Sequence, residues 1–405
     1  MKRIGIIGGG AAGMMAAITA ARQGAKVILF EKNDRVGKKI LSTGNGKCNL
    51  GNLQLSRQEY HSTDEELLTD VLEAFGTRET IQFFRSLGLW LKEKNGYLYP
   101  LCEQAAVVLD ALRYELRVLN VEILYEATVT HIRPKNYGFV IHYTGGKREV
   151  DRVILAGGGC AAPKTGSDGS CIALAADLGH KIIPQVPALV QLKCKEDYFK
   201  AVSGVRCDAV IRAYTEKELI AEEVGELQLT DYGVSGIPIF QLSRQVNYAL
   251  LAGRKVTLRV DVLPNIDREE FKLLQTGRNL LLAERTVEEF LSGTVNKKLV
   301  NLFIKLAGLK PTTNCEAVTQ EQLSKVYDLM KEWTIEVAAH KGFDNAQVSA
   351  GGVSLKEIDV RMESKVVPGL YLAGEVLDVD GRCGGYNLQW AWSSGYLAGV
   401  AASKD

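Results

Sequence analysis

The sequence lacks an excess of either charge and lacks any long apolar run. Its 405 residues carry 49 Lys and Arg against 48 Asp and Glu, a formal net charge of +1. Nucleic-acid binding relies on clustered cations, so we expect no nucleic-acid partner. No apolar stretch reaches the roughly 18 residues that a membrane-spanning helix needs. No basic segment, apolar helix and cleavage site stand before the first strand, so we expect a cytoplasmic protein without a membrane span.

Metal-ligand spacing is also missing. The eight cysteines contain no C-x-x-C pair, and the five histidines show no ligand pattern. This argues against a zinc cluster and against a thioredoxin-type redox pair. We therefore predict no metal site and expect most cysteines to be small core residues.

The first thirty residues predict a strand, a glycine turn, a helix and a second strand. Arg3–Ile7 is short and apolar, as in a strand buried on both faces. The turn that follows matches G-x-G-x-x-G at Gly8, Gly10 and Gly13. These glycines permit a tight turn, close approach of a pyrophosphate and close helix packing. Glu31 ends the second strand, where a carboxylate can bind an adenosine ribose. The segment predicts FAD or NAD binding; the alternative is a tight turn without a ligand.

Two further segments are dense in glycine and polar residues. Residues 37–49 could wrap an anionic ligand with backbone N–H groups and lysines, or form an ordinary surface loop. Residues 374–389 contain the glycine pair Gly384–Gly385 and precede a helix expected at Trp390–Ala402. This arrangement predicts a second anion-facing helix start. Ala156–Gly159 resembles another fingerprint, but Pro163 lies where its helix would run. We therefore expect no second nucleotide-binding domain.

Hydrophobic periodicity predicts the elements up to residue 186. Helices are expected at Asp64–Phe75, Thr77–Leu87 and Ala105–Leu119. A β-meander is expected next, with strands at Val121–Tyr125, Thr128–Ile132, Phe139–Tyr143 and Val153–Leu155. Tyr97–Pro100 is expected to be a short extended piece.

The pattern changes from about Pro187. Lys255–Val262 alternates polar and apolar residues, which is typical of an antiparallel strand with one wet face. Its expected partners are Cys207–Tyr214, Leu219–Glu223 and Glu226–Thr230. A helical block is expected at Asp267–Glu284, Thr286–Leu291, Asn296–Leu306 and Glu321–Met330. Strands at Gln347–Ser349 and Leu370–Ala373 would return to the first domain, so a β part and a helical part interrupt the nucleotide-binding fold.

Several motifs go beyond general nucleotide-binding logic. They are Ser42–Asn49, Gly225–Glu226 with Gly233–Gly236, Gly351–Val353, Met362–Lys365 and Gly369–Gln389. Together they resemble the YhiN/BaiN-like NAD(P)/FAD-dependent oxidoreductases over essentially the whole chain. The resemblance implies a split α/β Rossmann-like FAD domain with an inserted antiparallel, barrel-like β domain and a small helical domain. The implied domains are 1–187 and 346–405 for FAD, 188–264 plus 331–345 for the β domain, and 265–330 for the helices.

The resemblance also implies the cofactor site. The expected FAD-binding residues are Gly8, Gly10, Ala11, Ala12, Gly13, Glu31, Lys32, Lys38, Lys39, Thr43, Gly44, Asn45, Gly46, Lys47, Cys48, Asn49, Val129, Ala156, Gly157, Gly158, Gly374, Glu375, Gly385, Tyr386, Asn387, Leu388 and Gln389. Among these, Asn387 and Leu388 are expected to aim backbone N–H groups at the flavin N1/O2 edge. The alternative is that Asn387 only caps the last helix. Two positions depart from the family: Lys47 replaces a usual arginine, and Asp231 a usual histidine.

The chemistry stays open between three classes. Family members include a reductase of conjugated 3-oxo bile-acid rings and an oxidase of aminoacetone, and a tRNA-modifying flavoprotein is a third possibility. The near-neutral charge counts against RNA, and the large insertion favours a pocket for a bulky apolar small molecule. We therefore favour hydride transfer to an enone, with NAD(P)H as a transient electron donor. Tyr386 and Tyr232 are the candidate proton donors, although either tyrosine could simply be packing. The oligomeric state stays unknown.

Overall fold

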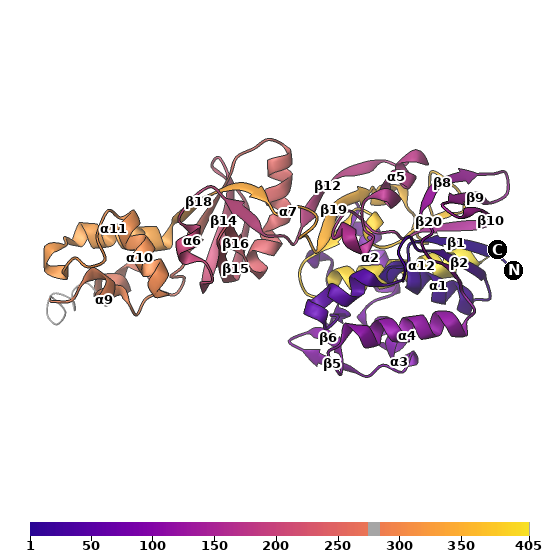
Figure 1. The fold of residues 1–405 in the computed structure, drawn as a ribbon, viewed down its shortest axis with the longest axis horizontal. Helices are drawn as coiled ribbons and strands as arrows, with labels where there is room; N and C mark the ends of the chain where they lie inside the picture. The colour runs from indigo at the N-terminus through magenta and orange to yellow at the C-terminus, as the bar shows by residue number, and fades with distance from the viewer. Residues whose placement is uncertain (274–283, 405) are drawn as a thin grey trace. The chain divides into compact units, whose positions relative to one another are not determined.

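A computed structural model describes residues 1–273 and 284–404 of the chain. The chain divides into two compact units, Met1–Val186 with Gln347–Asp405, and Pro187–Ala346. The second unit is therefore an insertion in the first (Figure 1). The domain limits expected inside that insertion, at 264/265 and 330/331, stay a prediction.

A five-stranded parallel sheet forms the centre of the first unit, in the order β20-β11-β1-β2-β7. Its strands are β1 (Arg3–Ile7), β2 (Lys26–Phe30), β7 (Glu122–Leu124), β11 (Arg152–Leu155) and β20 (Leu370–Leu372). Ile4 and Ile6 of β1 are fully buried, as expected for a central strand covered on both faces. The sheet therefore contains a strand from each end of the sequence.

The expected four-stranded meander is wrong at both of its ends. Only β8 (Val129–Pro134), β9 (Phe139–Tyr143) and β10 (Gly146–Val150) form an antiparallel sheet. The first and last strands of the expected meander, β7 and β11, pair in parallel with β2 and β1 instead. The sequence of a short apolar strand does not predict which strand it pairs with, because packing of the whole domain decides the pairing. The strand β10 was not predicted; four of its five residues are exposed, so it carries little apolar pattern.

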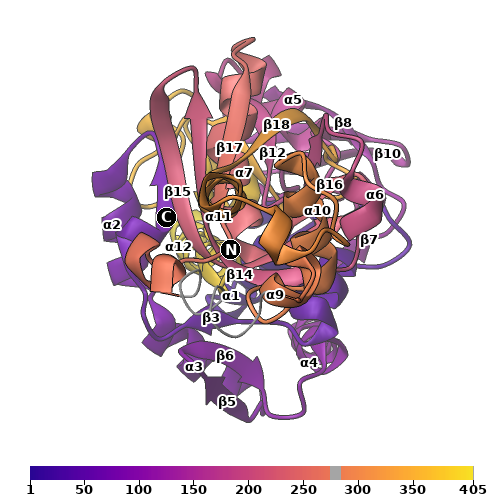
Figure 2. The same ribbon diagram turned by 90° about the vertical axis from the view of Figure 1, so that its left-hand side faces the viewer.

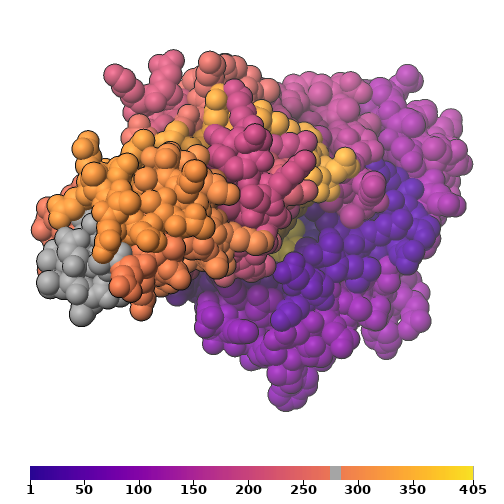
Figure 3. Space-filling model, turned by 60° about the vertical axis from the view of Figure 1, so that its left-hand side comes forward, coloured from indigo at the N-terminus to yellow at the C-terminus, as the bar shows by residue number. Residues whose placement is uncertain are grey.

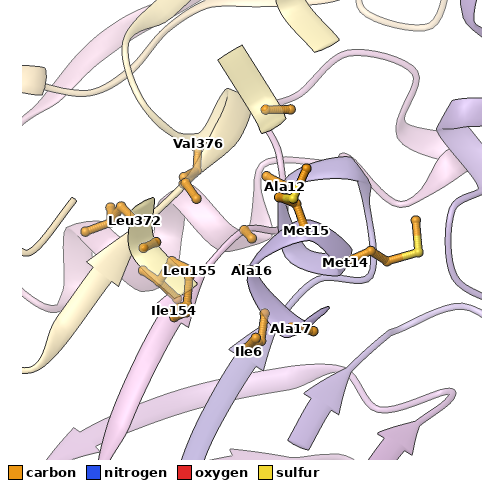
Figure 4. Packing of buried hydrophobic residues seen from close by; sticks show 14 of the residues in the cluster. Ile6, Ala12, Met14, Met15, Ala16, Ala17, Ile154, Leu155, Leu372 and Val376 are labelled. Atoms are coloured by element: carbon orange, nitrogen blue, oxygen red, sulfur yellow. The ribbon is translucent and has the colours of Figure 1, made fainter. Parts of the chain in front are cut away.

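Two helices beside the sheet pack against each other so closely that only glycine fits at their contact. They are α1 (Ala11–Arg22) and α12 (Tyr386–Ser403). A Cβ on Gly395 of α12 would lie 2.5 Å from the Ala12 carbonyl oxygen, and one on Gly399 would lie 2.6 Å from that of Ala16. Figure 4 shows the apolar side of this layer, with Ile6, Ile154, Leu155 and Leu372 of the sheet gathered against α1. The last helix begins at Tyr386, four residues before the expected start.

The remaining elements of the first unit surround this core. The three expected helices are confirmed as α2 (Glu65–Ala74), α3 (Thr77–Ser86) and α4 (Ala105–Val118). Three small sheets consist of β3 (Gly51–Asn52), β6 (Tyr97–Pro100) and β5 (Leu91–Lys94); β4 (Tyr60–Ser62) and β21 (Val379–Gly381); and β12 (Ile182–Ala188) and β19 (Val348–Val353). A short helix, α5 (Ser170–Asp177), follows a 3₁₀ turn, η3 (Pro163–Thr165).

The second unit contains a closed barrel in the order β13-β16-β15-β14-β17-β18. Its strands are β13 (Leu192–Cys194), β14 (Arg206–Thr215), β15 (Glu218–Thr230), β16 (Gly233–Ser235), β17 (Val256–Asp261) and β18 (Trp333–His340). Val256, Leu258 and Val260 of β17 are fully buried, which confirms the alternation seen in the sequence. The two strands expected at 219–223 and 226–230 are one strand, because Gly225 continues the ladder opposite Ala209.

Helices accompany this barrel. A long one, α7 (Ile237–Leu251), lies against β15 and was missed by the sequence reading (Figure 2). The others are α6 (Phe199–Val202), α9 (Val287–Leu291), α10 (Lys297–Leu306) and α11 (Gln320–Lys331), of which the last three are orange in Figure 3. These three confirm the expected helical block. The helix expected at Asp267–Glu284 falls partly on 274–283, outside the described residues.

Candidate functional site

A cavity opens at the carboxyl ends of β1, β2 and β11, where the glycine turn leads into α1. Its empty volume is about 1260 Å³ including the open mouth, enough for a nucleotide-sized ligand. Every residue that lines it belongs to the first unit. Ligands of open α/β sheets bind at this edge, outside the carboxyl ends of the strands.

The glycine turn is shaped as the fingerprint predicts. A Cβ on Gly13 would lie 1.9 Å from the Gly8 carbonyl oxygen, so this glycine allows the helix to approach the turn. A Cβ on Gly10 would meet no atom within 4 Å, so the chain here faces open space. Gly10 precedes α1 without a side-chain cap, which leaves the first N–H groups of that helix free for an anion. This arrangement fits the pyrophosphate of a dinucleotide.

The carboxylate of Glu31 is held in place by the backbone around it. Its Oε2 accepts a hydrogen bond from the Gly9 N–H at 2.9 Å. Its Oε1 accepts from the Asn33 backbone N–H at 2.8 Å and from the Asn33 Nδ2 at 2.7 Å. Only 6% of Glu31 is exposed. A carboxylate oxygen can accept more than one hydrogen bond, so this fixed group can still bind ribose hydroxyls.

The three lysines that line the cavity are each paired with a carboxylate. Lys32 contacts Asp168 at 2.6 Å and Lys38 contacts Asp34 at 2.7 Å. Burial alone would raise the pKa of Asp168, but hydrogen bonds from Lys32 and Ser170 outweigh it and hold that pKa below its usual range.

The third pair reaches across the chain from Lys39 to Glu375. Their atoms Nζ and Oε2 are 2.6 Å apart, and the Glu375 Oε1 accepts the Ser349 N–H at 2.9 Å. Lys39 lies in η1 (Lys38–Gly46), whereas Glu375 lies in η6 (Gly374–Val376). The pair therefore joins the two glycine-rich segments at the wall of the cavity.

The start of α12 forms another part of the lining. Its N-cap is Gly385, with φ 93° and no side-chain cap, so Asn387 does not cap the helix and that alternative is wrong. The Asn387 side chain instead pairs with the backbone of Gly381, accepting from its N–H at 2.8 Å and donating to its carbonyl oxygen at 2.7 Å. Asn387 and Leu388 both line the cavity.

Most of the residues expected to bind the cofactor meet around this one cavity. They are Gly8, Gly10, Ala11, Ala12, Glu31, Lys32, Lys38, Lys39, Thr43, Val129, Ala156, Gly157, Gly158, Gly374, Glu375, Asn387 and Leu388. These residues come from seven separate stretches of the sequence. The fold therefore brings the two glycine-rich segments to the same site as the fingerprint.

The other expected residues do not line the cavity. They are Gly13, Gly44, Asn45, Gly46, Lys47, Cys48, Asn49, Gly385, Tyr386 and Gln389. Gln389 is a core residue that donates to the Thr80 hydroxyl at 2.9 Å. Cys48 is buried too, and burial raises the pKa of its thiol to about 12. Lys47 is half-exposed and pairs with Glu103 at 2.7 Å.

The sequence reading missed a group of lining residues just before and in α5. They are Thr165, Gly166, Ser167, Ser170, Cys171 and Leu174. The glycines at 166 and 169 were the available signal, since both adopt left-handed backbone conformations. Other lining residues, which were not predicted individually, are Ile7, Gly9, Phe30, Gly37, Ile40, Ala127, Thr128, Gln347, Val348, Val379, Trp390 and Ala391.

The two candidate proton donors lie in different units. Tyr386 is 5% exposed, its hydroxyl donates to the Gln54 carbonyl oxygen at 3.4 Å, and burial raises its pKa to about 12. Tyr232 is half-buried in the second unit, where the Lys341 ammonium lies 4.2 Å from the centre of its ring. Asp231 beside it is exposed.

The described residues hold no group of three or more His, Cys, Asp or Glu side chains that could bind a metal ion. Within residues 1–273 and 284–404, no helix is long and apolar enough to cross a membrane.

Comparison with known proteins places these features in context. A family model described as "HI0933-like protein Rossmann domain" matches residues 2–401. A 3-dehydro-bile acid delta(4,6)-reductase from Clostridium scindens is 45% identical over 407 residues, covering 100% of both chains. A ribosomal RNA dihydrouridine synthase from Haemophilus influenzae is 29% identical, covering 99% of this chain and 98% of that protein.

A solved structure shows the same fold without close sequence similarity. It is a 3-ketosteroid delta1-dehydrogenase from Sterolibacterium denitrificans in complex with 1,4-androstadiene-3,17-dione, with 14% identity. The match covers 100% of each chain with a TM-score of 0.51.

Proposed function

This chain belongs to the HI0933-like Rossmann-domain family and is an FAD-dependent oxidoreductase, and we propose that it reduces a carbon–carbon double bond conjugated to a carbonyl group. The observation that carries the proposal is the full-length 45% identity with a 3-dehydro-bile acid delta(4,6)-reductase. A bulky apolar enone, such as a steroid dienone, is the proposed substrate class.

The more distant relatives support the same bond chemistry. In a delta(4,6)-3-oxo steroid the double bonds are conjugated to the C3 carbonyl, and in uridine the C5=C6 bond is conjugated to the C4 carbonyl. Dihydrouridine is the product in which the C5=C6 bond of uridine is saturated. Relatives at 45% and 29% identity therefore differ in substrate while they share one type of reduction.

Bound FAD would supply the hydride for the β-carbon of such an enone. The chain would bind its pyrophosphate at the α1 N-terminus and its ribose at Glu31. The N–H groups of Asn387 and Leu388 at the start of α12 would lie at the flavin N1/O2 edge, where the positive end of the helix dipole favours negative charge.

A tyrosine is the proposed proton donor to the α-carbon. Burial raises the pKa of Tyr386 to about 12, so its phenol carries a proton near neutral pH. Tyr232 is the other candidate. Tyr386→Phe and Tyr232→Phe, compared for turnover of the FAD-loaded enzyme, separate the two, and full turnover in both variants would refute both assignments.

We also propose a cytoplasmic enzyme that receives electrons transiently from NAD(P)H. The reason is that the sequence has one complete dinucleotide fingerprint, and in the described structure Ala156–Gly159 lead to the 3₁₀ turn η3 rather than to an α-helix. A crystal soak that places NADPH in a Rossmann site of its own would contradict this.

The decisive experiment compares substrates on one FAD-loaded preparation. Protein reduced anaerobically with NADPH is mixed with a steroid dienone or with ribosomal RNA, and oxidised protein is mixed separately with aminoacetone. We expect the dienone to reoxidise the flavin. Bleaching of oxidised flavin by the amine, with peroxide formed in air, would replace the proposal with the oxidase alternative.

Ribosomal RNA is the second candidate substrate, because two relatives at 29% identity are ribosomal RNA dihydrouridine synthases. The balance of 49 basic against 48 acidic residues counts against it, since RNA binding needs clustered cations. Dihydrouridine formed in the RNA arm, with no reaction in the dienone arm, would favour this candidate instead.

A further inference from the structure

Residues 159–170, here called the strap, form a closed loop beside the cavity. The Gly159 carbonyl oxygen accepts from the Gly169 N–H at 2.9 Å and from the Ser167 hydroxyl at 3.1 Å, so the loop is closed at its base. Near that base, the Ser349 Oγ accepts the N–H groups of Cys160 and Ala161 at 2.7 and 2.9 Å. The strap therefore has a fixed base from which its tip extends.

The tip of the strap lies on the loop that follows β2. Thr165, Gly166 and Ser167 all line the cavity there. Gly166 has a φ of 114°, which favours glycine, and a Cβ there would lie 2.6 Å from the Asn33 Nδ2 and displace that amide. The strap therefore meets the chain directly after Glu31, the residue that would bind the adenosine ribose.

Two contacts join the tip to that loop. The Asn33 Nδ2 donates to the Thr165 carbonyl oxygen at 3.1 Å and to the Glu31 carboxylate at 2.7 Å. The Lys32 ammonium pairs with the Asp168 carboxylate at 2.6 Å, with side-chain exposures of 22% and 44%. Asn33 thus couples the ribose-binding carboxylate to the strap, while Lys32 and Asp168 form an ion pair at the cavity wall.

We propose that the strap covers the adenosine end of the FAD site and that Asp168 and Asn33 are positioning residues that slow the release of FAD. The proposal rests on the FAD assignment but not on the substrate. FAD can leave by the adenosine end only after the tip separates from residues 32 and 33. Breaking either contact therefore raises the rate of release without changing the groups that face the flavin.

The first test uses Asp168→Asn in the FAD-loaded protein. FAD release is followed by the recovery of free-flavin fluorescence after dilution, with no enone present. A partly exposed ion pair is weak, so we expect release to become about two- to fivefold faster. Release from the unmodified protein should accelerate with added salt, which screens the pair, whereas Asp168→Asn should lose most of that dependence.

A matched control breaks a similar pair away from the cavity. Glu115→Gln removes the partner of Arg22, 2.7 Å away in a contact between α4 and α1. We expect no change in FAD release or in its salt dependence. Equal acceleration in both variants would mean general loosening of the unit and would overturn the proposal.

A double-mutant cycle keeps the proposal testable if one variant folds poorly. Lys32→Met and Asp168→Asn should each speed release, and the double variant should be no faster than the faster single variant, since both remove one pair. Asn33→Ala should speed release by about tenfold, more than either ion-pair variant, because it removes the bond to the Thr165 carbonyl oxygen and also those to Glu31 and Lys38. Release rates equal to those of the unmodified protein in all three positions would refute the strap, even if enone reduction is established.

Discussion

The buried carboxylate of Glu31 accepts hydrogen bonds from three N–H groups at the wall of the cavity. Glu31→Ala removes the expected ribose acceptor, so FAD affinity should fall by about 1 to 3 kcal/mol, measured by titrating the apoprotein with FAD. Glu65→Ala is a suitable control, because that carboxylate is 70% exposed and does not line the cavity. Unchanged affinity in Glu31→Ala would mean that Glu31 only orders the loop after β2.

Glu103 ties the glycine-rich loop to β5 through two lysines. It pairs with Lys47 and Lys92, both at 2.7 Å, and hydrogen bonds from Lys47 and then Lys92 lower its pKa to about 2. Because the folded pKa lies below the ordinary value of 4.5, the stabilisation is present above pH 4.5 and is lost as pH falls toward 2.

Glu103→Gln should therefore be less stable than the unmodified protein at pH 6, with a difference that shrinks as the pH falls. Denaturant unfolding at a series of pH values measures this. The difference should be small, since the pair is exposed and screened by solvent. A difference that grows on acidification would contradict the assigned direction of the pKa shift.

At the scale of elements, the N-terminus of α12 carries the expected contact with the flavin edge. Leu388→Pro deletes one N–H in the first turn, where proline is tolerated, so the fold should persist. Loss of one donor near the reduced flavin should lower its midpoint potential by about 20 to 60 mV in a dye-equilibration titration.

Leu388→Ala is the control for this measurement, because it shortens the side chain and keeps the N–H. Its potential should stay close to that of the unmodified protein. A fully folded Leu388→Pro variant with the same potential would place these donors away from the flavin.

The contact between α1 and α12 decides whether Gly395→Ala stabilises or destabilises the protein. Gly→Ala inside a helix normally stabilises by about 0.5 to 1 kcal/mol. At Gly395 the new Cβ would meet the Ala12 carbonyl oxygen at 2.5 Å, so overpacking should win and Gly395→Ala should destabilise by about 1 to 3 kcal/mol.

Thermal or denaturant unfolding with Gly293→Ala as control checks this expectation. A Cβ on Gly293 meets no atom within 4 Å and its φ is not left-handed, so its effect should stay within about 0.5 kcal/mol. A stabilised Gly395→Ala protein would mean that the two helices can separate without cost.

Helices and strands with a clear hydrophobic periodicity could be predicted from the sequence. Those with polar residues on their buried face could not. The strand β17 alternates strictly and was found, whereas α7 carries Ser243 and Asn247 on its buried face. The Ser243 hydroxyl donates to the Phe240 carbonyl oxygen, and the Asn247 Nδ2 donates to the carbonyl oxygen of Pro187. A search for apolar periodicity does not register polar residues on a buried face, so the helix was missed.

Across the whole chain, the sequence predicted those parts of the site in which glycine fixes the backbone geometry better than the parts without such a glycine. Gly8 and Gly374 stand where the chain turns and approaches its neighbours closely, Gly10 faces open space, and their motifs located the cavity. The strap could not be predicted, because its place beside Glu31 depends on contacts between residues about 135 positions apart in the sequence, such as Asn33 with Thr165.

We propose that this FAD protein saturates a double bond conjugated to a carbonyl group. The most direct measurement is an anaerobic single turnover, in which protein reduced with one equivalent of NADPH is mixed with a steroid dienone and both flavin absorbance and steroid mass are followed. We predict one flavin reoxidised for each steroid that gains two hydrogen atoms. Flavin that stays reduced while the dienone is recovered unchanged would contradict the proposed reduction of an enone.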